Sequence, residues 1–310
     1  EQILHNWGVY IQQNNADTGF GGFLINNNDG YSYLAKMYQG REGSWQFTLP
    51  FTPEPGEPTY LFLFYLFLGH VARWTALPMI VVFHAARLIA TGFLVFAVSA
   101  FFRESVFPEH PRMARLSTFL ALFGSGMGWM LAVFRIFTMD LWVADAYPFL
   151  AAYTNPHFPL GFAMMLTIFN LVLAPLTGKR AISLFFLGLL LAIILPFGLV
   201  VVGVMCAGKF LWDSIETRTF QPWKYVALFG GGLPVLCYQL LVAAAHPVLS
   251  IWNAQNVTIS PPLWDALISL LPALFLAPVG IRAAWRSRQK PGMRLLLTWF
   301  VLGAVLVYFP

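Results

Sequence analysis

Residues 78–103 read PMIVVFHAARLIATGFLVFAVSAFFR, and this stretch decides the fold class. A lipid bilayer needs about 20 consecutive apolar residues for one helical crossing. The stretch meets that length, and Arg87 is its only charge before Arg103. We therefore predict a membrane-spanning helix over 78–102 that ends in a loop rich in arginine.

The charges of the remaining loops are sorted in the same way. Every second loop between apolar segments is basic, with thirteen basic and four acidic residues in total, whereas the opposite side holds five basic and nine acidic residues. The basic loops contain Arg103, Arg112, Arg115, Lys179, Arg180, Lys209, Arg218, Lys224, Arg282, Arg286, Arg288, Lys290 and Arg294. Because Lys and Arg accumulate in cytoplasmic loops, we expect residues 1–57 and the 135–157 loop to share the outer face.

The composition supports a polytopic membrane protein. Hydrophobic residues make up 58% of the 310 and charged residues only 10%, against about 25% charged in soluble domains. The net charge of +5 comes from the basic loops, so it indicates topology and no nucleic-acid partner. Cys206 and Cys237 both lie in apolar segments and are expected to pack as small hydrophobic side chains.

We predict an all-α transmembrane helical bundle with an outer-face loop and interfacial helices. Residues 1–76 would form the outer-face region with juxtamembrane helices, and residues 77–310 a transmembrane domain of about seven or eight spans. Residues 59–74 are too short to cross and are expected to lie on the outer leaflet. The predicted spans are 78–102, 113–134, 158–177, a pair within 181–212 hinged near Pro196, 224–245, 262–281 and 293–309. Delivery of residues 1–57 to the outside suggests a first span before Glu1, and further sequence is expected after Pro310.

Asp29 is the first candidate for chemistry. It precedes a helical pattern in Asn26-Asn27-Asn28-Asp29-Gly30-Tyr31 on the outer side. A carboxylate there could act as a general base or a metal ligand. It could also cap the helix, since Asp accepts hydrogen bonds from first-turn N–H groups.

Two further groups could supply binding contacts. Asp140 and Asp145 lie in a short aromatic outer loop, and His157 stands at the start of the next span. Arg87 and His84 lie one turn apart within an apolar span, where a charge tends to face a cavity or a partner. Solvation of the two acids, packing of His157 and snorkelling of Arg87 are the structural alternatives. The segment 124–128, GSGMG, is interpreted as a site of close helix packing inside the 113–134 span.

These features resemble the C-type glycosyltransferase superfamily, whose polytopic members use polyprenyl-phosphate sugars and include the protein mannosyltransferase and aminoarabinose transferase branches. The resemblance covers roughly residues 26–180 and rests on an acidic motif that opens an outer helix, a Gly-containing stretch, prolines with an interfacial helix, and an Arg-Leu pair. These are Asp29-Gly30-Tyr31-Ser32-Tyr33-Leu34-Ala35, Gln39-Gly40-Arg41-Glu42-Gly43, Leu68-Gly69-His70 and Arg87-Leu88. The resemblance implies that Asp29 is the catalytic base. Many members have two adjacent acids, whereas here Asn28 and Gly30 flank Asp29, so an acid of the 140–145 loop could substitute.

The leading hypothesis is therefore transfer of a sugar from a polyprenyl-phosphate donor on the outer face of a multi-pass protein in a prokaryotic plasma membrane. Asp29 would deprotonate the acceptor (a lipid, glycan or protein), and Arg87 and His157 would neutralise the phosphate leaving group. A divalent metal could take part. A transporter or flippase of a lipid-linked substrate, and a non-catalytic membrane scaffold, are the alternatives. The cytoplasmic loops are interpreted as plain anchors, whereas a transporter should offer polar access from both sides.

Overall fold

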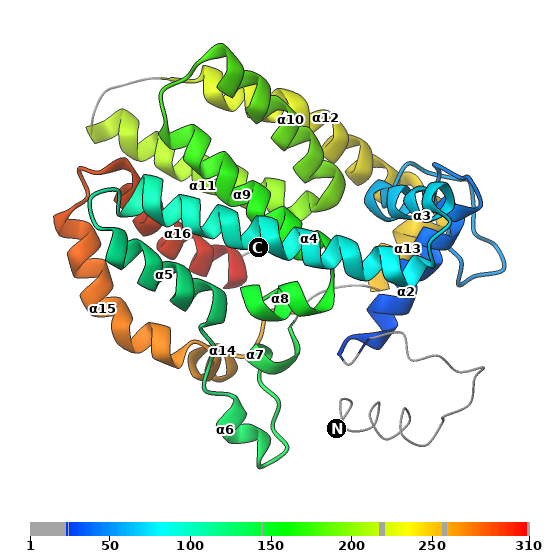
Figure 1. Ribbon diagram of the computed structural model, residues 1–310, viewed down its shortest axis with the longest axis horizontal. Coiled ribbons are helices and arrows are strands. Elements are labelled where there is room, and N and C mark those ends of the chain that lie inside the picture. The colour runs from blue at the N-terminus through cyan, green and yellow to red at the C-terminus, as the bar shows by residue number, and fades with distance from the viewer. Residues whose placement is uncertain (1–22, 24, 144, 217–220, 256–258, 309–310) are drawn as a thin grey trace.

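A computed structural model describes residue 23 and residues 25–143, 145–216, 221–255 and 259–308 (Figure 1). In these residues the chain is helical, and one isolated bridge between Phe47 and Thr59 is the only strand-like pairing. The all-helical prediction is thus confirmed for the part of the chain described.

Among the described residues, four helices are long and apolar enough to cross a membrane. They are α4 (Met79–Ala100, continued by the π-helix η1, Phe101–Val106), α11 (Pro196–Glu216), α12 (Trp223–Ala245) and α16 (Pro291–Tyr308). A fifth crossing is possible if α14 (Leu263–Ser269) and α15 (Leu271–Arg286), which are bent by 78° at Leu270, form one broken span. The fold is therefore compatible with a multi-pass membrane protein.

Two shorter helices complete the bundle. α9 (His157–Leu173) and α10 (Gly178–Ile194) contain 17 residues each, which gives about 26 Å of helix. The predicted hinge near Pro196 is confirmed, because α10 ends at Ile194 and α11 begins at Pro196. Proline suits the first turn of a helix because its missing N–H has no partner there.

The main core lies where α9, α10, α11 and η1 meet. Its largest fully buried side chains include Phe101, Ile168, Phe169, Leu184 and Leu199. In Figure 1, α4 runs across the front of this group, with α10 and α12 on one side and α5 and α16 on the other. The apolar segments that define the spans also supply the core.

The predicted span over 113–134 is wrong. α5 (Pro111–Phe123) has 13 residues, and the chain then leaves the helix at Gly124 and forms the single turns α6 (Trp129–Ala132) and α7 (Met139–Trp142) before α8 (Pro148–Thr154). A side chain at Gly128 would lie 1.7 Å from Thr138 Oγ1. The glycines of segment 124–128 thus allow a loop to fold against α7, and they do not mediate packing between helices.

Two helices lie in the described part of residues 1–76. α2 (Asn27–Arg41) packs along α3 (Leu63–Thr75), and the proline-rich segment between them carries the Phe47–Thr59 bridge. A Cβ at Gly40 would lie 2.0 Å from Leu66 O, and one at Gly69 would lie 2.0 Å from Met37 O. Glycine is therefore needed at both positions for this close approach, which fixes α2 against α3. α13 (Pro247–Gln255) follows α12 at the same end of the bundle.

The basic loops meet at the opposite end. Lys290 Nζ lies 3.1 Å from Glu109 Oε2, and Arg294 Nε lies 2.9 Å from Asp213 Oδ1. These ion pairs join three loops that the charge pattern assigns to one side of the membrane.

Candidate functional site

Asp29 lies in the first turn of α2 and is not its cap. The helix begins at Asn27, and the cap position is occupied by Asn26, whose side chain makes no capping hydrogen bond. The expected cap at Asp29 is therefore wrong by position, although a carboxylate in the first turn still interacts favourably with the helix dipole. The Asp29 side chain reaches the surface, and partial burial raises the pKa of its carboxyl, while the charge of Lys36 opposes the rise.

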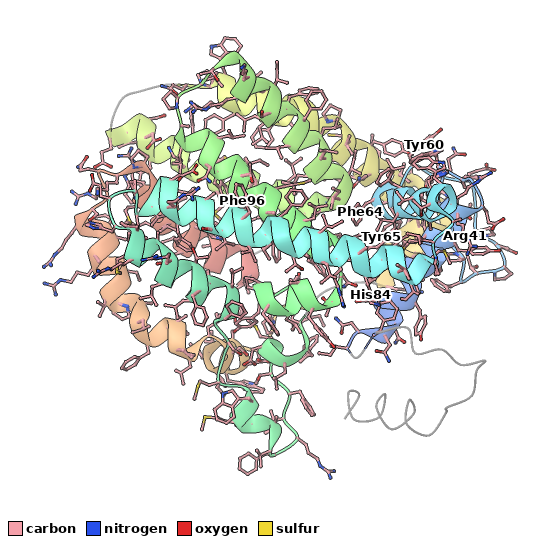
Figure 2. The ribbon with its side chains drawn as sticks, in the orientation of Figure 1. Arg41, Tyr60, Phe64, Tyr65, His84 and Phe96 are labelled. Carbon is pink, nitrogen blue, oxygen red and sulfur yellow. The ribbon has the colours of Figure 1, made fainter. Side chains whose placement is uncertain are left out.

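A hydrogen-bonded aromatic cluster, formed by Tyr33, Tyr65 and His157, begins on the helix that carries Asp29. Tyr33 stacks on Tyr65 of α3 with ring centres 4.2 Å apart, and Tyr65 Oη lies 2.6 Å from His157 Nδ1 at the start of α9. The His157 ring also meets the edge of Tyr33 at 5.1 Å. The cluster, which includes Tyr65 as labelled in Figure 2, ties three elements together and buries His157.

Lys36 is a buried cation at this site that the sequence analysis did not single out. Its side chain is 4% exposed, donates to Ser32 Oγ at 2.7 Å, and lies 4.6 Å from the Phe62 ring centre and 4.9 Å from that of Tyr33. Burial lowers the pKa of Lys36 to about 8, and the charge of Asp29 opposes the fall. The seven-residue spacing from Asp29, two helical turns, was the signal that could have linked the two residues.

Asp145 acts on the same cluster as Asp29. Burial raises the pKa of Tyr33, and the charges of Asp29 and Asp145 raise it further. Asp145 is exposed and lies just before α8. The structure therefore brings two of the three predicted acids within electrostatic reach of one tyrosine.

Asp140 has a different environment. Its carboxylate accepts hydrogen bonds from Thr138 Oγ1 at 2.6 Å, Gly128 N–H at 2.9 Å and Ser269 Oγ at 3.1 Å. Ser269 Oγ also lies 3.0 Å from Asp265 Oδ1, so its single O–H is shared between the two carboxylates, and Tyr147 Oη donates to the Ser269 carbonyl. These contacts give Asp140 a structural role, because it joins the glycine loop, α7 and α14.

Arg87 and His84 both lie on α4. Arg87 Nη1 donates to the Tyr153 carbonyl at 2.5 Å, and the guanidinium carbon lies 5.6 Å from the Tyr153 ring centre. The His84 ring, labelled in Figure 2, packs against Phe23 and Phe83 with centres 5.7 and 5.4 Å apart. Arg87 is thus held to α8, while the contacts of His84 are mainly aromatic.

Arg87 lines one of two adjoining cavities. The larger has a volume of about 570 Å³ and is lined mostly by apolar side chains of α4, η1, α9, α11 and α16, with Asp145 as its charged lining residue. The smaller, of about 250 Å³, is lined by Arg87 and shares Leu94 and Pro148 with the larger. The arrangement offers an apolar chamber next to one acid and one guanidinium.

The described residues give no support for a bound metal. Among them, no three His, Cys, Asp or Glu side chains come close enough to hold a metal ion. The divalent metal considered from the sequence therefore has no donor set in this part of the chain.

Comparison with known proteins identifies no match to this chain. No family model, no curated protein and no solved structure matches it.

Proposed function

We propose that this protein is a membrane glycosyltransferase similar to the C-type superfamily, which moves a sugar from a polyprenyl-phosphate donor to an acceptor at the outer face. The observation that carries the proposal is the cavity of about 570 Å³ whose lining is apolar except near Asp145. A chamber of this kind suits the isoprenoid chain of a lipid-linked donor, because burial of apolar surface favours binding.

The acids at the outer end provide the base. Asp29 has a raised pKa, and a carboxylate with a higher pKa is a stronger base at neutral pH. Asp29 would take the proton of the acceptor as the acceptor atom attacks the anomeric carbon. The bond between that carbon and the phosphate oxygen breaks, with inversion. Asp145, near the same tyrosine, would supply the second acid that Asn28 and Gly30 do not.

Cations near the cavities would neutralise the phosphate that leaves. Arg87 uses one N–H on the Tyr153 carbonyl, and a guanidinium has five such donors. It therefore keeps donors for a phosphate in the smaller cavity that it lines. Lys36 adds a buried positive charge on the side of Asp29. His157 is buried and bonded to Tyr65, which favours a role in positioning the tyrosines.

The test is release of polyprenyl phosphate from labelled lipid-phosphate sugars by the protein in membrane vesicles. Asp29→Asn keeps the size of the side chain and removes the base, so turnover should fall at least about a hundredfold. Glu42→Gln, an exposed acid at the other end of the same helix, is the matched control and should retain activity. Equal turnover in Asp29→Asn and wild type would remove Asp29 from the mechanism.

One observation favours the alternative of a transporter or flippase. A polar cavity of about 370 Å³ lies at the opposite, basic end of the bundle and is lined by Lys209, Lys224 and Arg294. The basic end is therefore more than a set of plain anchors, and polar access from both sides is what transport requires. Movement of an intact sugar lipid across vesicles without bond cleavage would favour this alternative, and neither activity would favour a scaffold.

A further inference from the structure

The basic end of the bundle contains a cavity with buried positive charge. Lys209 on α11, Lys224 at the start of α12 and Arg294 at the start of α16 line it, and their side chains are 5%, 7% and 5% exposed. Burying a cation is costly unless an opposite charge compensates for it. The partners of these three cations therefore decide what the cavity can bind.

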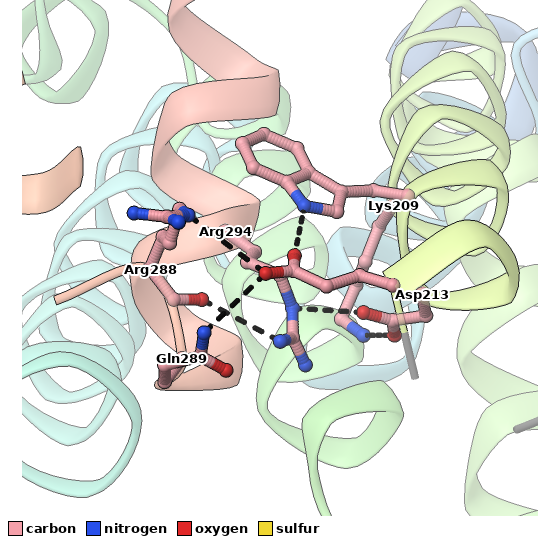
Figure 3. Close-up of polar contacts among 7 residues, drawn as sticks. Lys209, Asp213, Arg288, Gln289 and Arg294 are labelled. Carbon is pink, nitrogen blue, oxygen red and sulfur yellow. Dashed lines mark hydrogen bonds and ion pairs between the residues drawn. The ribbon is translucent and has the colours of Figure 1, made fainter. Parts of the chain in front are cut away.

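One acid, Asp213, forms ion pairs with two of the three cations. Asp213 lies 2.9 Å from Arg294 Nε and is also paired with Lys209, one turn earlier on α11 (Figure 3). The nearby Glu216 is engaged by Arg288 at 3.8 Å and by Trp212 Nε1. The cavity lining thus holds three cations and one anion.

Lys224 is the cation that this acid does not pair with. Its ammonium group donates to the Val172 carbonyl at 2.9 Å, and no ion pair reaches it among the described residues. An ammonium group has three donors. Lys224 therefore keeps donors and uncompensated charge inside the cavity.

Helix ends of both signs meet at the cavity, because the C-terminal turns of α9 and α11 line it together with two helix starts. The cap position of α12 is Pro222, which makes no side-chain capping bond, and Gln221 and Lys224 at this helix start line the cavity. The first N–H groups of a helix have no partner within it, and the helix dipole favours an anion there. The start of α16, at Pro291, lines the same cavity.

We propose that this cavity is a binding site for a phosphate group, with Lys224 and Arg294 as its main charged contacts. A cavity of about 370 Å³ with three buried cations fits either the headgroup of an anionic phospholipid or a soluble phosphate. The phosphate site uses neither Asp29 nor the cavities lined by Asp145 and Arg87, so it stands whether or not the chain transfers a sugar.

The experiment measures the thermal unfolding midpoint of the full chain in neutral detergent by tryptophan fluorescence. One arm titrates inorganic phosphate against sodium chloride at constant ionic strength. The other arm compares phosphatidylglycerol with phosphatidylcholine in mixed micelles. A saturable rise of the midpoint with either phosphate compound supports the site. A rise with both assigns a site that accepts the free anion, and a rise with phosphatidylglycerol alone assigns a lipid headgroup.

Variants locate the effect. Lys224→Gln should weaken the apparent affinity about tenfold or more, because a hydrogen bond to a charged group is lost. Lys224→Arg keeps the charge and should retain the response. Arg282→Gln, which removes an exposed charge outside the cavity lining, should respond like wild type. If wild type shows no saturable response to either compound, or Lys224→Gln responds as wild type does, the proposal is overturned. The wild-type titration decides the matter even if Lys224→Gln does not fold.

Discussion

Lys36 makes the stability of the outer-face region depend on pH. Its pKa falls from 10.5 to about 8 on folding because the side chain is buried, and a pKa unit corresponds to about 1.4 kcal/mol. The unfolded chain therefore binds more protons than the folded chain between about pH 8 and pH 10.5, so stability should rise with pH across that window. The expected gain is about 3 kcal/mol.

The assay compares wild type with Lys36→Met in detergent and measures the free energy of unfolding from pH 7 to pH 10.5. At pH 7 the variant should be the more stable, since it no longer buries a charge. The difference should shrink as the pH passes about 8 and wild-type Lys36 loses its proton. Groups other than Lys36 titrate in both proteins, so the difference isolates this lysine. A difference that stays constant over the whole range would refute the reasoning.

Three further predictions concern residues that position the site. Tyr65→Phe removes the hydrogen bond to His157 Nδ1 and should cost about 1 kcal/mol of stability, with a fall in donor turnover that Phe64→Leu should not reproduce. Asp140→Ala leaves the Thr138 and Gly128 donors without their acceptor and should destabilise by about 2 kcal/mol or more, measurable by thermal unfolding; an unchanged midpoint would contradict its structural role. Gly69→Val forces α3 away from Met37 O and should cost about 1–3 kcal/mol by overpacking, whereas Gly92→Ala, which meets no neighbouring atom within 4 Å, should be tolerated.

The sequence predicted the elements whose signal is local. Apolar length located α4, α11, α12 and α16, and Pro196 located the break between α10 and α11. Residues 113–134 were misassigned because apolar length cannot reveal that Asp140, further along the chain, binds the Gly128 N–H. The loop is thus stabilised by a contact that no window of sequence contains.

The candidate site was only partly predictable for a similar reason. Asp29 and Asp145 carry a recognisable outer-loop pattern, and the structure relates both to Tyr33. Lys36 and Lys224 were counted only as loop charges, because burial depends on neighbours from other helices. Lys36 lies against Phe62, and Lys224 bonds to Val172, 52 residues away. Charge counts thus predict a side for each loop but do not reveal which cations are buried.

The network around Ser269 has a consequence for the wall of the larger cavity. Asp145, Ala146 and Pro148 line that cavity, and the intervening Tyr147 is bonded to the Ser269 carbonyl across 122 residues of sequence. Ser269 lies one residue before the 78° bend that joins α14 to α15. This part of the cavity wall is therefore tied to the bent helix pair, so it cannot shift at Tyr147 unless α14 moves with it or this bond breaks.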